Sequence, residues 1–223
     1  MFSLQEAGRV GLAVFRVMRD SELTREIHVT EEITGRGRFV DIQGEVERTD
    51  EGRDLLRDKP ELSSRQVDYD ALRDLPADTL GGAYVRHLDD NGLSADYQAA
   101  GNTHWVTDPD MAYLMRRFRQ THDVWHVLTG LGTEGHEEVI IHAFSWGQLR
   151  LPVSAMVVFF GTLKHILGEA RWPALRHGLH EAYEHGRRAD DLMPVYWERY
   201  WEQQLDAVRE RYGIEPCTPA FVT

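Results

Sequence analysis

The sequence predicts an all-α fold built as a single domain, residues 1–223. Three observations indicate it: helix-start signals recur along the chain, apolar residues follow them at steps of three and four, and no ladder of alternating strands can be assembled. A chain of 223 residues that is 42% hydrophobic is long enough to bury one substantial core. We therefore expect one helical domain.

The first expected helix begins at the N-terminus. Ser3 and Glu6 match a capping box, and apolar residues then recur at helical spacing as far as Met18. Residues 24–73 are charged and weakly periodic, and residues 38–47 alternate in polarity like a strand. We therefore interpret residues 1–48 as an N-terminal helix followed by a charged connection, and assign no firm element between 24 and 73.

Clear start and stop signals mark the next two helices. Thr79 is placed to cap a helix that ends near Asn91 and Gly92. Asp108, Pro109 and Asp110 then combine an N-cap carboxylate, a proline at the first helical position and an acid in the first turn. Apolar residues follow at steps of three and four until the chain reaches Gly130.

Three further helices are expected in the remaining chain. Thr133 is placed to cap a helix over residues 134–148, and its short connection to the preceding helix predicts an antiparallel hairpin. Residues 151–167 are apolar almost all round. Pro194 is expected to open a last helix, which ends at Gly213 and presents one apolar face. That face comprises Trp197, Trp201, Leu205, Val208 and Tyr212.

One motif has the spacing of metal ligands. His122, Asp123 and His126 are followed after eleven residues by Glu138. On a helix the two histidines lie about 40° apart and one turn along, and Asp123 widens the donor set to about 100°. The glycine turn brings the next helix back, so Glu138 can face them. Two imidazoles and two carboxylates suit Zn²⁺ or another first-row divalent ion, with Fe²⁺ also compatible.

The place of His122 within the apolar series favours a buried partner for it, because a buried polar group requires one. The alternative is structural: His122 bonds a carbonyl or Glu138, and Asp123 is solvated. Both interpretations remain open at this point. His136 is a further candidate close to Glu138, although a surface position suits it equally.

Other charged clusters have both a functional and a structural interpretation. His177, His180, Glu181 and His185 share helical spacing, but no apolar pattern places them inside, so a solvated helix face is favoured. Arg116, Arg117 and Arg119 lie about one turn before His122. They suit an anionic headgroup or substrate, or equally a charged helix face.

The apolar stretch 149–168 has more hydrophobic surface than one buried helix face requires. It includes Met156, Phe159 and Phe160. A core helix is the default interpretation, and the lining of a lipid tunnel or a membrane contact is the alternative. Its charged residues leave it short of the roughly 20 apolar residues that span a bilayer.

Composition excludes several classes of protein. The formal net charge of −12 opposes binding to nucleic acid, which requires clustered positive charge. The single cysteine, Cys217, excludes an intramolecular disulfide and a cysteine-based metal site. The first residues lack the pattern of a secretory signal and are too acidic for an organellar transit peptide. We therefore expect a reducing compartment, with the protein soluble or peripheral on a membrane.

These motifs together resemble the Coq4 family of ubiquinone biosynthesis. The resemblance lies in His122-Asp-x-x-His126 with Glu138, preceded by Arg117-Phe-Arg119, and in three flanking segments. Those segments are Thr49–Arg53, Leu75–Gly81 with Tyr84, and Tyr196–Glu198 with Trp201, Glu202 and Leu205. The likeness covers about residues 49–216 and is weaker over 1–48.

The resemblance implies an all-α fold with an apolar cavity for a polyprenyl lipid and a divalent metal, usually zinc. Its ligands carry over to His122, Asp123, His126 and Glu138, which would form the catalytic centre. It further implies other quinone-biosynthesis proteins as partners. Because the mitochondrial members carry a transit peptide, we expect a bacterial homologue in the cytoplasm, peripheral on the inner membrane. The apolar surplus is also compatible with a homodimer.

The activity implied is promotion of C1 oxidative decarboxylation of a prenylated 4-hydroxybenzoate, a metal-dependent lyase reaction. In this hypothesis the metal polarises a substrate oxygen, the tail follows Met156, Phe159 and Phe160, and Arg117 or Arg119 lies near the polar end. The alternative is a non-catalytic lipid-binding scaffold that organises a quinone-biosynthesis complex.

Two other metal-dependent classes fit less well. A phosphohydrolase with a His-Asp doublet needs further ligands on other helices, and it gives no reason for the spacing from His126 to Glu138. A zinc peptidase of the HExxH type needs glutamate where Asp123 stands.

Overall fold

The structure is a computed structural model that describes residues 6, 8–10, 12, 24–96, 105–169 and 172–217. Within these ranges it is helical, and the one strand-like feature is an isolated antiparallel bridge between Thr79 and Gln204. The all-α prediction is therefore confirmed. The helix expected over residues 3–18 lies almost entirely outside the described residues.

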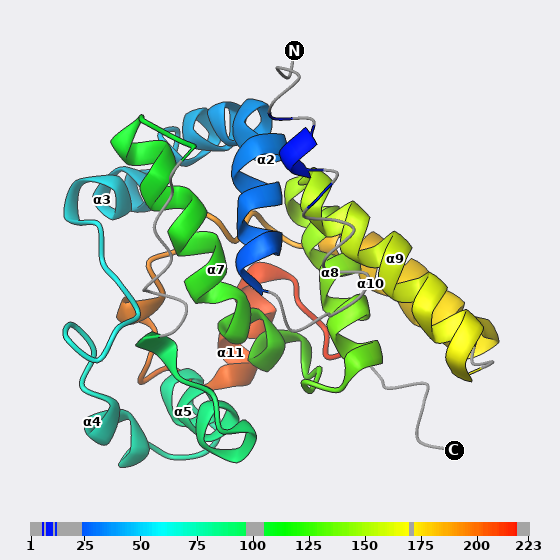
Figure 1. Ribbon diagram of the computed structural model, residues 1–223. Helices are drawn as coiled ribbons and strands as arrows, with labels where there is room; N and C mark the ends of the chain where they lie inside the picture. Colours follow the sequence, from blue (N-terminus) through cyan, green and yellow to red (C-terminus); the bar gives the residue numbers. More distant parts are fainter. Residues whose placement is uncertain are drawn as a thin grey trace.

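Nine α-helices and a short 3₁₀ helix make up the described chain. They are α2 (Thr24–Val46), α3 (Asp50–Asp58), α4 (Tyr69–Arg73), α5 (Leu80–Asn91), α7 (Pro109–Thr129), α8 (Gly135–Leu149), α9 (Pro152–Glu169), α10 (Trp172–Arg188), η1 (Trp197–Arg199) and α11 (Leu205–Tyr212). Helix α7 lies near the middle, with α2 beside it (Figure 1). Helices α8, α9 and α10 pack together on one side, and α3, α4 and α5 lie on the other.

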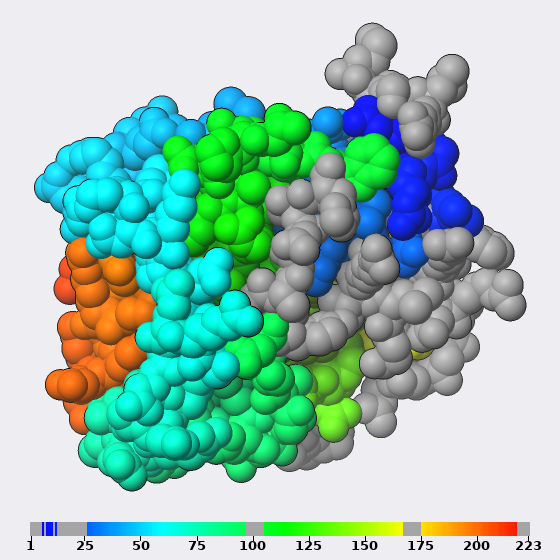
Figure 2. Space-filling view, turned by 60° about the vertical axis from the view of Figure 1, so that its left-hand side comes forward, coloured from blue at the N-terminus to red at the C-terminus, as the bar shows by residue number. Residues whose placement is uncertain are grey.

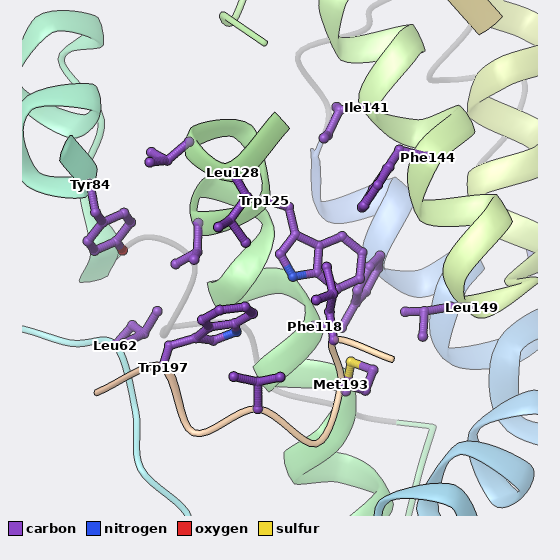
Figure 3. Close-up of a cluster of buried hydrophobic side chains, with 14 of the residues drawn as sticks. Leu62, Tyr84, Phe118, Trp125, Leu128, Ile141, Phe144, Leu149, Met193 and Trp197 are labelled. Atoms are coloured by element: carbon purple, nitrogen blue, oxygen red, sulfur yellow. The ribbon is translucent and has the colours of Figure 1, made fainter. Parts of the chain in front are cut away.

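The core forms around α7, whose Trp125 is fully buried. Its indole meets the rings of Phe118 and Phe144 edge to face, at centroid distances of 5.7 and 6.0 Å. Figure 3 shows these rings with Trp197 beside them. Edge-to-face pairs add to the stabilisation that buried apolar area provides. The core thus ties α7 to α8 and to the segment around η1.

The predicted caps of α5 and α7 are confirmed. The Thr79 side chain accepts a hydrogen bond from Gly82 N–H, and the Asp108 side chain accepts from Asp110 and Met111. Gly92 and Gly130 end the two helices with φ of 62° and 70°. In this left-handed region glycine carries no steric penalty.

The strand-like alternation of residues 38–47 was misleading, since residues 38–46 belong to α2 and residue 47 to the turn after it. Helix α2 buries Ile33, Phe39, Ile42 and Val46 on one face. It also buries two acidic residues, Glu31 and Glu32, which local sequence assigns to the surface. Tertiary packing therefore overrides the local polarity pattern in this segment.

Two helix boundaries also differ from the prediction. Helix α8 begins one residue later than expected, with Glu134 as its N-cap, while the Thr133 hydroxyl donates to Asn91 instead. The continuous helix expected from Pro194 is replaced by η1 and the shorter α11. Between η1 and α11 the backbone forms hydrogen bonds with residues 78–81 and not within a helix. Leu80 N–H donates to the carbonyl of Gln203, and Leu205 N–H donates to the carbonyl of Asp78.

The segment around η1 contacts helix α3, which lies far away in the sequence. Tyr196 N–H donates to Glu51, and the Arg199 guanidinium donates to Asp54. Figure 2 shows this orange segment lying against the cyan segment that contains α3. No helix in the described ranges is both long and apolar enough to cross a membrane.

Candidate metal centre

Two consecutive helices position the predicted ligands. His122 and His126 lie one turn apart on α7. In the loop that follows, Gly132 N–H and Glu134 N–H each donate to one oxygen of the Glu137 carboxylate. These bonds satisfy N–H groups at the start of α8 that have no partner within the helix. They fix the first turn of α8, and Glu138 is the next residue.

Three side chains converge at this point, as their spacing predicts. The Nε2 atoms of His122 and His126 are 3.1 Å apart, and each lies 3.4 Å from a carboxylate oxygen of Glu138. Tetrahedral coordination with bonds of about 2.0–2.1 Å separates neighbouring donors by about 3.3 Å. His122 faces Oε2 of Glu138 and His126 faces Oε1, so these separations suit a carboxylate that shares one zinc-sized ion with the two imidazoles, and one donor atom from each residue lies within 4.8 Å of the others.

The orientation of His126 also suits a metal ligand. Its Nδ1 lies 3.2 Å from the carbonyl oxygen of Leu131, which can only accept a hydrogen bond. Nδ1 therefore donates to this carbonyl, and Nε2, which faces His122 and Glu138, is the ring nitrogen placed to bind a metal. A backbone carbonyl that fixes the tautomer in this way is a common feature around metal-bound histidines.

The charges of the cluster favour a cation. Burial opposes the ionised form of Glu138, but hydrogen bonds from His122 and His126 outweigh it and hold the pKa of that carboxyl well below its usual range. Burial likewise opposes protonation of His122, yet its contact with Glu138 raises the pKa of the imidazole. A carboxylate that keeps its charge beside two imidazoles is a donor set typical of first-row divalent ions.

Asp123 lies apart from these three donors. The residue is buried, its carboxylate accepts no hydrogen bond from the described residues, and it is outside the converging group. Burial raises the pKa of its carboxyl group. The structure thus brings together three of the four predicted ligands, and a role of Asp123 in metal binding stays a prediction.

Two histidines that the sequence analysis did not single out flank the cluster. The ring of His142, on α8, is 5.3 Å from that of His122, and the ring of His87, on α5, is 5.4 Å from that of His126. Burial, followed by the charge of the neighbouring imidazoles, lowers their pKa values to about 3 and about 4. The i, i+4 step from Glu138 to His142 was the available signal for one of them.

The two arginines predicted near a lipid headgroup are internal. Arg117 is buried and makes two 2.7 Å hydrogen bonds to Glu198. Arg119 is buried against Glu31 and Glu32. Neither arginine lies on the charged, solvated helix face that was the structural alternative. Their contact with a headgroup stays a prediction.

The remaining histidine candidates occupy ordinary positions. His177 pairs with Glu181 at 2.9 Å on the exposed part of α10, and His185 Nε2 accepts from Glu215 N–H. Neither belongs to the converging donor group found among the described residues. His136 is half-buried near the start of α8, and its role stays a prediction.

The apolar helix α9 is present and partly uncovered. Phe159 is 64% exposed, whereas Met156 and Phe160 are half-buried. A pocket of about 640 Å³ opens elsewhere, between residues 64–73 and 88–96, and none of its lining residues belongs to α9 or to the three-donor cluster. An apolar lipid cavity along α9 stays a prediction.

Fold and site together define an all-α protein with a histidine–carboxylate cluster shared by two consecutive helices. Residues 3–218 match the family model described as coenzyme Q (ubiquinone) biosynthesis protein Coq4. The chain belongs to this family. The match begins at residue 3, so it extends further into the N-terminal segment than the sequence motifs alone indicated.

Relatives in animals agree with this assignment. The chain is 36% identical over 183 residues to the mitochondrial ubiquinone biosynthesis protein COQ4 homologue of Drosophila ananassae, covering 82% of the chain and 68% of the relative. It is 34% identical over 212 residues to the human protein of the same name, covering 95% and 77%.

A bacterial crystal structure has the same fold. It is that of a protein from Nostoc punctiforme provisionally assigned to ubiquinone biosynthesis. Its superposition on this chain gives a TM-score of 0.71 with 24% sequence identity, and covers 93% of this chain and 97% of the Nostoc chain.

Proposed function

We propose that this chain acts in ubiquinone biosynthesis, where it binds a polyprenyl quinone precursor at a divalent-metal site. There it promotes C1 decarboxylation of a prenylated 4-hydroxybenzoate. The observation that carries the proposal is the convergence of His122, His126 and Glu138: the two Nε2 atoms are 3.1 Å apart, and each lies 3.4 Å from a different carboxylate oxygen of Glu138. Membership of the Coq4 family supports the pathway.

Zinc is the ion we favour, with iron also compatible. Two imidazoles and a carboxylate leave further coordination positions for Asp123 or for substrate oxygen. A bound divalent ion supplies Lewis-acid polarisation of an oxygen ligand and stabilises negative charge nearby. This matches a reaction in which the bond from C1 to the carboxyl carbon breaks and its electron pair stays on the ring. Without oxidation a proton takes the place of CO₂ at C1. In the oxidative form a hydroxyl group takes its place: one atom of dioxygen enters the ring, and the other leaves as water with two protons and two electrons from an external reductant.

The exposure of the surrounding residues determines from which side a substrate can reach the cluster. His126 is fully buried, whereas His122 and Glu138 are 16% and 38% exposed, so the cluster is open on one side only. The buried wall around His126 excludes water from one side. The exposed apolar side chains of α9, Phe159 among them, support a place for the isoprenoid tail or for contact with the cytoplasmic face of a bacterial inner membrane.

Metal analysis of the purified chain, without affinity tag or chelator, tests the proposal. We expect about one zinc or iron per wild-type chain and loss of that metal in His126→Ala, because the variant removes one of three donors. His177→Ala is the matched control, since His177 pairs with Glu181 on an exposed helix. Native mass spectrometry of the same samples should detect a prenyl lipid. A wild-type chain that binds no divalent metal, or a His126→Ala chain that keeps it, contradicts the proposal.

The scaffold alternative is favoured by the closed pairing within the cluster, where His122, His126 and Glu138 also satisfy one another. Glu138→Gln separates the two functions, because it removes the ligand charge and keeps the shape. We expect this variant to retain prenyl lipid but fail to complement a strain that lacks its Coq4 homologue. Complementation at wild-type level would favour the scaffold.

A further inference from the structure

Four imidazoles form a continuous row across the candidate metal centre. The order is His87, His126, His122 and His142, with successive ring centroids 5.4, 4.7 and 5.3 Å apart. The two inner rings are the candidate ligands. The two outer rings come from different helices, α5 and α8, and face the inner pair from opposite ends.

Each outer histidine has a buried ring nitrogen without a partner among the described residues. These atoms are Nδ1 of His142 and Nε2 of His87. Buried polar atoms in folded proteins almost always have a hydrogen-bond partner, and exceptions often mark a place for a water molecule or a ligand. The outer imidazoles therefore carry binding capacity that the fold itself does not use.

The outer histidines, both half-buried, have inner neighbours that differ in exposure. His126, which contacts His87, is fully buried, whereas His122 and Glu138 at the other end are partly exposed. His142 lies one helical turn after Glu138, on the same side of α8. A ligand that approaches past the partly exposed His122 and Glu138 therefore lies closer to His142, which contacts His122, than to His87, which contacts His126.

We propose that His142 is a ligand-binding residue, whose ring N–H donates a hydrogen bond to the carboxylate or phenolate oxygen of an aromatic acid held between α7 and α8. The inference rests on the proposed function, and it names the group that recognises the polar end of the substrate. The imidazole ring offers a flat face to an aromatic ligand as well as a donor. His87 lies at the opposite end of the row and packs against His126.

Binding of 4-hydroxybenzoate to zinc-loaded protein tests this role by titration calorimetry. In His142→Phe the ring remains and the donor is lost, so we expect affinity for 4-hydroxybenzoate to fall about tenfold or more. His142→Asn restores a donor near the position of Nδ1, so we expect it to recover most of the affinity. His87→Phe is the matched control, because it makes the same change beside the fully buried His126 and should bind like wild type.

Zinc affinity, measured by competition with a chelator, keeps this inference separate from the proposed function. We expect His142→Phe to keep zinc affinity within about threefold of wild type while 4-hydroxybenzoate affinity falls. Unchanged 4-hydroxybenzoate affinity, an equal loss of zinc affinity, absence of rescue by asparagine, or a zinc-loaded wild type that does not bind 4-hydroxybenzoate would each overturn the assignment of His142. Failure of the wild type to bind metal would instead contradict the proposed function itself.

Discussion

Two bidentate arginine–carboxylate pairs with similar bond lengths differ in their surroundings. Arg117 donates twice to Glu198 at 2.7 Å inside the protein, and Arg73 donates twice to Asp89 at 2.8 Å on its surface. Removing one partner of a buried pair leaves an unpaired charge away from water. At the surface, water replaces the lost partner. Burial should therefore decide how much the loss of one partner lowers the free energy of unfolding.

Glu198→Gln should destabilise the protein strongly, because it leaves the buried Arg117 without a counter-charge. We expect a loss of about 3 kcal/mol in the free energy of unfolding, measured by urea denaturation. Asp89→Asn is the control with the same geometry at the surface, and should change stability little. Metal content should remain in both variants, because neither residue belongs to the donor cluster. Equal effects of the two substitutions would contradict this account.

At the scale of helices, the local signals were reliable where they depend on neighbouring residues. The caps at Asp108 and Gly130 bound α7 as predicted, since capping is a short-range interaction. Helix α2 escaped prediction because Glu31 and Glu32 are buried against Arg119, almost ninety residues away.

The candidate site shows the same division between local and distant information. His122 and His126 share one helix, and a short turn precedes Glu138, so spacing alone predicted their meeting. His87 comes from α5, a helix whose position beside α7 no local pattern specifies. The last segment was similarly misread, because the pairing of residues 203–205 with 78–80 replaces helix hydrogen bonds there.

The contact between α8 and α10 depends on two glycines. A Cβ atom on Gly147 would lie 2.3 Å from the carbonyl oxygen of Tyr183, and one on Gly186 would lie 2.2 Å from that of Phe144. The backbones of the helices therefore touch directly, which a methyl group would prevent. Gly186→Ala should cost about 1–3 kcal/mol, measured by urea denaturation.

Gly37→Ala provides the control for that prediction. Gly37 is exposed within α2, and a Cβ atom there has no neighbour within 4 Å. Alanine should stabilise this helix by up to about 1 kcal/mol, because it restricts the unfolded chain more than glycine does. If both alanine variants were stabilised, the close approach of α8 and α10 would not be a constraint.

For the whole molecule, buried neutral histidines connect folding stability to pH. Burial, and then the positive charge of Arg119, lowers the pKa of His28 to about 3 from its usual 6.5. Between these two values the unfolded chain binds a proton at this position that the folded chain refuses. The stabilisation is therefore complete above about pH 6.5 and is lost progressively as the pH falls toward 3.

Comparison with His28→Gln isolates this contribution from all other titrating groups. Glutamine is polar and does not titrate. The free energy of unfolding of this variant should therefore fall less steeply between pH 6.5 and 4, and the difference in slope should correspond to at most one bound proton. Urea denaturation of both metal-free proteins across this range measures the difference. Metal-free samples are required because protonation also releases metal from histidine ligands, which would add its own acid dependence. Parallel pH profiles would mean that His28 is protonated as readily in the folded chain as in the unfolded one.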